Sequence, residues 1–250
     1  MAITTTGIAF TISSLGLAFC GLRFFRAFQN MGGLRSGQRI GFLLSTLFFG
    51  FSLQHGILAI GGLFFSQIPE ALYAILVVDH IVLIFVTALA VYSAFYILLP
   101  KISPWPATIA ISLFSVFVNW LTINEHFSPF VTVTNSIDWN MPHRLKFLWY
   151  IILLVGIGAL FLVFVKNFFL AQSRNVKNIS FLLMAIHFAG MVNVSIIFSD
   201  FLTGVREIRS KMFDIILAII GIAFIIGFLF VPFVAGWVSR KPQNVGNDIR

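Results

Sequence analysis

The chain has 250 residues, of which 59% are hydrophobic and only 10% are charged. Its mean hydropathy of +1.01 excludes an ordinary soluble domain, in which about 25% of residues carry a charge. The formal net charge of +8 lies in short segments between apolar stretches, without a basic tail or a recognition helix, so we exclude nucleic-acid binding. We therefore predict an all-α, multi-pass integral membrane protein of the cell or inner membrane.

Seven segments are long and apolar enough to cross a bilayer, whose hydrocarbon core of about 30 Å requires roughly 20 apolar residues in a helix. The first segment has no charged leader before it, so we expect it to be a retained helix and not a cleaved signal peptide. Residues 239–250 form a short polar tail. The predicted spans are 6–28, 40–65, 71–99, 105–123, 147–170, 179–201 and 213–238.

The distribution of basic residues predicts the orientation of this seven-helix bundle. Eleven of the 16 lysines and arginines fall in the first, third and fifth loops, at their span ends, and in the tail. Short cytoplasmic loops collect Lys and Arg, so the N-terminus should lie outside and the C-terminus in the cytoplasm. Tryptophans near the predicted span ends are typical of an interfacial aromatic belt. These tryptophans are Trp105, Trp120, Trp139, Trp149 and Trp237.

Several strongly polar residues interrupt the apolar spans, and five of them could line one cavity: His55 in the second, Asp79 and His80 in the third, and His187 and Asn193 in the sixth. The directions of these spans place most of them in the outer half of the bilayer, with Asp79 about 12 Å below the outer end of its helix. A carboxyl group at that depth costs several kcal/mol unless a partner, a proton or water relieves it. These five residues are our candidates for ligand or ion binding.

Two interpretations of this polar set remain open. The side chains could line one outward-facing cavity, or they could be separate interhelical hydrogen-bonding groups without a shared space. Consecutive residues are about 100° apart on a helix, which predicts that Asp79 and His80 point in different directions. One should face the bundle axis and the other a neighbouring helix.

The loop between the fourth and fifth spans contains "FVTVTNSI", in which apolar and hydroxyl residues alternate. This alternation, with Pro129 before it and Asn135-Ser136 near its end, predicts a short β-hairpin or lid over the outer face. Four loop residues are candidates for contact with a ligand at the mouth of a cavity, although all could equally be solvated. They are Glu125, His126, Asp138 and Trp139.

We predict no cofactor. Seven helices with an external N-terminus are also the topology of retinal proteins, but a retinal Schiff base needs a buried lysine, and residues 213–238 contain none. Haem b ligation needs two histidines at equal depth, and His55, His80 and His187 show no recurring spacing, so haem is only a minor alternative. An intramembrane metal enzyme would need several converging ligands, and no motif identifies them or the metal.

These observations predict a sensor, a receptor-like module or a non-catalytic subunit of a membrane complex, with an outward-facing polar cavity. We favour a non-enzymatic protein whose partners are the lipid bilayer and either another protein or a second copy of the chain. The first alternative is a small transporter or channel for an ion, a proton or a solute. The near absence of charge in the inner halves of the spans counts against a conduction path. A haem- or metal-binding membrane enzyme is the third alternative.

Overall fold

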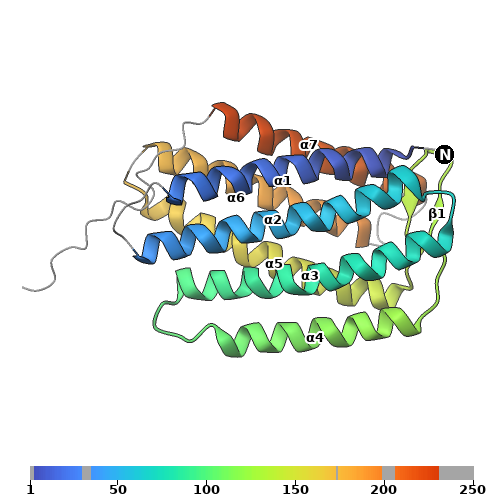
Figure 1. Cartoon of the computed structure of the whole chain (residues 1–250), viewed down its shortest axis with the longest axis horizontal. Coiled ribbons are helices and arrows are strands. Elements are labelled where there is room, and N and C mark those ends of the chain that lie inside the picture. The colour runs from blue at the N-terminus through green and yellow to red at the C-terminus, as the bar shows by residue number, and fades with distance from the viewer. Residues whose placement is uncertain (1–2, 30–34, 173, 199–205, 231–250) are drawn as a thin grey trace, which may run out of the picture.

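The computed structural model describes residues 3–29, 35–172, 174–198 and 206–230. It contains seven long helices and one two-stranded sheet (Figure 1). The helices are α1 (Thr5–Gln29), α2 (Arg35–Phe64), α3 (Pro69–Leu98), α4 (Trp105–Asn124), α5 (His143–Leu170), α6 (Arg174–Phe198) and α7 (Arg206–Phe230). The strands are β1 (Phe130–Val131) and β2 (Ile137–Asp138), which pair antiparallel. The chain is thus an all-α bundle with one small hairpin.

Prolines mark the starts of three helices. α3 begins at Pro69, Pro106 is the second residue of α4, and Pro142 directly precedes α5. Proline suits the first helical turn because its missing N–H would have no intrahelical partner there. α5 and α7 begin four and seven residues before their predicted spans, at His143 and Arg206, because their polar first turns are also helical. Residues 199–201 and 231–238 of the predicted spans, and the predicted tail, lie outside the described residues.

All seven helices are long and apolar enough to cross a membrane. Their outward surfaces are apolar as well: Phe42, Phe85 and Leu113 are 62%, 70% and 66% exposed. Large, exposed apolar side chains on every helix would be unfavourable in water but are expected against lipid tails. The fold therefore fits a multi-pass integral membrane protein.

Six of the helices form a closed ring. α1 packs between α2 and α7, and the ring continues through α3, α5 and α6 back to α7. α4 lies outside this ring, against α3 and α5, at the lower edge of the bundle in Figure 1. The apolar fifth span is therefore part of the ring, and Leu145, Ile152 and Leu160 on its inner face are completely buried.

α1 approaches both of its neighbours closely at glycines. A Cβ atom on Gly62 of α2 would lie 2.6 Å from the backbone N and Cα of Gly7, and one on Gly16 would lie 2.5 Å from the carbonyl oxygen of Gly221 in α7. No side chain fits at these two crossings. Small residues at helix contacts are typical of membrane bundles, because close backbone approach increases van der Waals contact.

The hairpin lies at the end of the bundle that also holds the N-terminus; we refer to this end as the hairpin end (Figure 1). Its turn is closed by a hydrogen bond from Thr132 N to Ser136 O, and Asn135 adopts a left-handed backbone with φ of 61°. Asparagine tolerates this conformation well, which suits it to a tight turn. The alternating pattern predicted this hairpin, and the structure confirms it.

A polar network fastens the hairpin to α1 and α7. Asp214 of α7 accepts hydrogen bonds from Thr5 Oγ1 and Thr6 Oγ1, each at 2.8 Å. Thr6 Oγ1 in turn accepts the backbone N–H of Ile137, also at 2.8 Å, and Asn135 Nδ2 donates to Ile3 O. One buried carboxyl group thereby connects the first helix, the last helix and the hairpin.

The half of the bundle away from the hairpin is filled by a dense apolar cluster, which we call the apolar floor. It contains one stacked pair of rings, Phe24 and Phe48, whose centroids are 5.3 Å apart. Its members come from α1, α2, α3, α5, α6 and α7, so it closes the ring on that side. The buried residues of the apolar floor are Leu17, Cys20, Phe24, Leu44, Leu47, Phe48, Ala90, Leu160, Phe164, Ile179, Leu183, Ile186, Ile220 and Phe224.

Candidate functional site

A cavity of about 200 Å³ lies inside the helix ring, on the hairpin side of the apolar floor. All six ring helices contribute side chains to its wall, and α4 contributes none. Residues of β2 and of the segment that follows it also line the cavity, so this part of the loop between α4 and α5 belongs to the site. The polar or charged residues of the wall are Gln54, His55, Asp79, His80, Asp138, Lys146, Asn193 and Ser210.

Asp79 lies on the cavity wall with only 2% of its surface exposed. Its Oδ2 accepts a hydrogen bond from Gln54 Nε2 of α2, and the length of 3.4 Å makes this a weak contact. Its Oδ1 is buried and has no hydrogen-bond partner among the described residues. Asp79 is therefore only partly compensated by the protein itself.

His80 lies beside Asp79 in sequence but faces α5. Its ring stacks on the indole of Trp149 with centroids 3.8 Å apart, and its Nδ1 is buried without a hydrogen-bond partner in the described chain. Trp149 is itself fixed because its Nε1 donates to Thr122 Oγ1 of α4 at 3.0 Å. The two neighbours thus face different helices, as helical geometry predicts, yet both line the cavity because it lies between α2 and α5.

The remaining polar groups approach from α2, α6 and the hairpin. His55 Nδ1 forms a 2.8 Å hydrogen bond with Ser13 Oγ of α1. Asn193 of α6 is 2% exposed, and its Oδ1 has no partner within the described residues. Asp138 of β2 is 6% exposed; its Oδ1 accepts the N–H of Asn140, whereas its Oδ2 is buried without a partner there.

Four side chains of one cavity wall therefore hold buried polar atoms that no described residue satisfies: Asp79, His80, Asp138 and Asn193. Buried polar atoms in native proteins are nearly always hydrogen-bonded, and one left unpaired costs about 1–3 kcal/mol. Their gathering in one cavity is what a binding site for a polar group requires. Interhelical hydrogen bonding alone does not account for them.

The structure does not bring all the predicted candidates together. His187 lies in the apolar floor, between the rings of Phe48 and Phe164, and donates from Nδ1 to the carbonyl of Leu183 on its own helix. It is absent from the cavity wall. The packing of α6 turns the face that carries His187 toward Phe48 and Phe164 and not toward the cavity.

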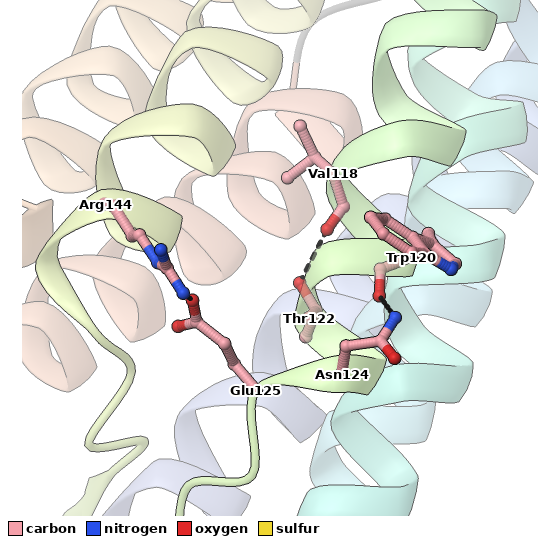
Figure 2. A network of polar contacts seen from close by, with 6 residues as sticks. All are labelled: Val118, Trp120, Thr122, Asn124, Glu125 and Arg144. Atoms are coloured by element: carbon pink, nitrogen blue, oxygen red, sulfur yellow. Dashed lines mark hydrogen bonds and ion pairs between the residues drawn. The ribbon is translucent and has the colours of Figure 1, made fainter.

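Glu125 and His126 also lie away from the cavity wall. Glu125 forms an ion pair with Arg144 that connects the end of α4 to the start of α5 (Figure 2). His126 stacks on the ring of Tyr73 at a centroid distance of 6.4 Å. In the last turn of α4, next to this ion pair, Asn124 Nδ2 donates a hydrogen bond to the backbone oxygen of Trp120 (Figure 2). By contrast, Asp138 and Trp139 of the same loop do line the cavity.

Gln54, Lys146 and Trp149 are among the wall residues that were not candidates. The sequence held a signal for Gln54, since an amide beside a histidine inside an apolar span is unusual. Trp149 was assigned to the interfacial belt, and this was wrong, because the residue is 1% exposed and lies inside the ring. Trp105 and Trp120 fit the belt better, with 59% and 57% of their surfaces exposed.

The donor set and the size of the cavity do not favour the cofactors considered from the sequence. Pockets for cofactors usually measure about 300–1,000 Å³, which makes a cavity of about 200 Å³ small for haem. Within the described residues, no group of three or more His, Cys, Asp or Glu side chains is arranged to hold a metal ion.

Comparisons with known proteins give no further indication of function. The chain matches no protein-family model, and no curated protein or solved structure matches it significantly.

Proposed function

We propose that this protein binds a small molecule in the cavity and acts as a sensor or receptor-like module in its membrane. The observation that carries this proposal is the set of four buried, unsatisfied side chains on one cavity wall, Asp79, His80, Asp138 and Asn193. A ligand that satisfied these groups would gain hydrogen bonds that the empty protein lacks.

The size of the cavity limits the ligand. A dry protein cavity of about 150 Å³ accommodates benzene, so about 200 Å³ has room for one ring with a short polar arm. The apolar part of the wall matches such a ring, because Phe10, Phe51 and Phe213 belong to it. Most pockets that select small molecules combine an apolar wall with a few placed polar groups in this way.

The predicted orientation, with the N-terminus outside, would place the hairpin end on the external face. The cavity that receives an external ligand would then be bounded by all six ring helices. A ligand shifts a conformational equilibrium by its differential affinity for two arrangements of these helices. The change would pass to a partner protein or to a second copy of the chain, which supplies the output.

The transporter alternative is less well supported because of the apolar floor. A solute leaving the cavity toward the other end of the bundle would have to pass fully buried side chains such as Phe24, Phe48 and Phe164. Polar or charged solutes cross such a layer only if the helices separate and water enters. A binding site closed on its inner side fits a receptor without that additional step.

Gly190 provides a direct test, because it lines the cavity and a Cβ there would meet only Ile157 Cγ2, at 3.8 Å. We expect Gly190→Leu to fill the cavity and abolish ligand binding. Its melting temperature should stay the same or rise, since replacing a helical glycine removes a cost of about 1 kcal/mol. The measurement is thermal stabilisation of the protein in lipid nanodiscs by phenethylamine, phenethyl alcohol and phenylacetate.

The matched control is Gly158→Leu on α5. A Cβ at Gly158 meets only Met191 Sδ, at 3.9 Å, and the residue lines a separate groove against α4. At least one of the three compounds should stabilise the wild type and the control but not Gly190→Leu. If none stabilises the wild type, or if all three proteins respond equally, the cavity is not a ligand site.

A further inference from the structure

The unsatisfied atoms of the cavity wall differ in chemistry from those of an ordinary polar pocket. Three of them are oxygens: Oδ1 of Asp79, Oδ2 of Asp138 and Oδ1 of Asn193. Carboxylate and amide carbonyl oxygens only accept hydrogen bonds. Among these unsatisfied atoms acceptors therefore outnumber possible donors, which favours a ligand that carries several N–H groups.

The charged residues of the wall also favour a ligand that donates hydrogen bonds. Its acidic residues are Asp79 and Asp138, and its basic side chain is Lys146. Asp79 and Asp138 are almost fully buried, where the attraction between unlike charges is much stronger than in water. A positive ligand would supply the partner that an isolated buried carboxyl group lacks. A negative ligand would be repelled by both acidic groups.

The aromatic side chains of the wall suit the same kind of ligand. Trp149, which carries His80 on its face, and Trp139 belong to the wall together with Phe10, Phe51 and Phe213. Aromatic faces attract cations by about 0.5–2 kcal/mol, more when water is excluded. Rings also pack well against an apolar ligand body. The cavity thus combines acceptors for a cationic head with an apolar surface for the rest of the molecule.

We infer that the ligand is a small organic cation: a protonated amine on a short arm attached to a single ring or to an apolar group of similar size. This inference rests on the proposed function, because it names the ligand class of the same cavity. The ammonium group would donate to Asp79 Oδ1 and to one or both of Asn193 Oδ1 and Asp138 Oδ2, while the ring would lie against the aromatic wall.

Three compounds with the same ring but different charges test whether the cavity prefers a cation to a neutral molecule or an anion. Phenethylamine carries a positive charge, phenethyl alcohol is its neutral analogue, and phenylacetate is negative. Their affinities for the protein in nanodiscs can be measured by isothermal titration calorimetry, with empty nanodiscs as the blank for membrane partitioning. We expect the amine to bind at least tenfold more tightly than the alcohol, and phenylacetate to bind least.

The variant Asp79→Asn tests whether the carboxyl group of Asp79 binds the amine. The exchange preserves the size of the side chain, and we expect it to weaken amine binding at least tenfold without changing the affinity for the alcohol. Glu70→Gln is the matched control, because Glu70 is an exposed acidic residue in the first turn of the same helix. This control should leave the affinities for all three compounds unchanged.

The outcomes distinguish this inference from the proposed function. If the alcohol or phenylacetate binds as tightly as the amine, and Gly190→Leu abolishes that binding, the cavity is a ligand site but its ligand is not a cation. An unchanged amine affinity in Asp79→Asn also overturns the inference. If none of the three compounds binds the wild type, the proposed function fails together with it.

Discussion

Replacing Asp214 with alanine is expected to lower the free energy of unfolding by about 3 kcal/mol. The carboxyl group accepts hydrogen bonds from Thr5 and Thr6, and Thr6 in turn holds the backbone of Ile137. Hydrogen bonds to a charged group contribute more than neutral ones, and their loss leaves the buried Thr6 hydroxyl without its acceptor. The hairpin should then separate from α1 and α7. Reversible unfolding in mixed micelles measures the change in free energy.

Asp214→Asn serves as the control for this prediction, since it retains one acceptor oxygen in a side chain of the same size. We expect the free energy of unfolding of Asp214→Asn to fall by only about 1 kcal/mol, and the hairpin to stay in place. Protease sensitivity of the loop 127–141 reports the position of the hairpin separately from overall stability. Equal stability of Asp214→Ala and the wild type would show that the network does not fasten the hairpin.

The second large effect is expected at the crossing of α1 and α2. A Cβ on Gly62 would lie 2.6 Å from the backbone of Gly7, which cannot move without displacing α1. Overpacking of this kind costs about 1–3 kcal/mol, and we expect Gly62→Ala to fall at the upper end because the contact is with main-chain atoms. The melting temperature in nanodiscs should drop, and binding in the cavity should weaken, since α1 contributes Phe10 to its wall.

Gly158→Ala is the matched control for the crossing. Its new methyl group would meet only the flexible side chain of Met191, at 3.9 Å, so helix propensity should dominate and stabilise the protein by up to about 1 kcal/mol. Opposite signs for the two glycine-to-alanine exchanges are the expected result. A loss of stability of similar size at both positions would mean that the close approach of α1 and α2 is unimportant.

The spans and the hairpin could be predicted because both depend on local patterns. Runs of about 20 apolar residues define helices of membrane length, and prolines such as Pro69 and Pro142 mark their starts. The alternation in "FVTVTNSI" likewise predicts a hairpin from neighbouring residues alone.

The composition of the cavity wall was less accessible from the sequence. Depth along a span does not say which face of a helix looks inward, so His187 could not be separated from Asn193 before the packing of α6 was known. Trp149 has the position of an interfacial residue, and only the stacking on His80 and the hydrogen bond to Thr122 show its place inside the ring. Closure of the ring by α1 and α7 depends on contacts more than 190 residues apart, as between Gly16 and Gly221.

Buried polar groups at the hairpin end share one cavity, whereas the opposite half of the bundle is closed by the apolar floor. The chain has a single cysteine, Cys20, which is fully buried, so Cys20→Ser gives a background for single-cysteine variants. Asn193 and Ser180 both lie on α6, at 2% and 0% exposure, and only Asn193 lines the cavity. They form a matched pair of positions.

The deciding measurement is the rate at which a small, positively charged methanethiosulfonate reagent modifies each variant in nanodiscs. We predict that Asn193→Cys reacts readily, that phenethylamine slows this reaction, and that Ser180→Cys does not react. Equal rates at the two positions, or no reaction at either, would contradict the existence of the shared cavity.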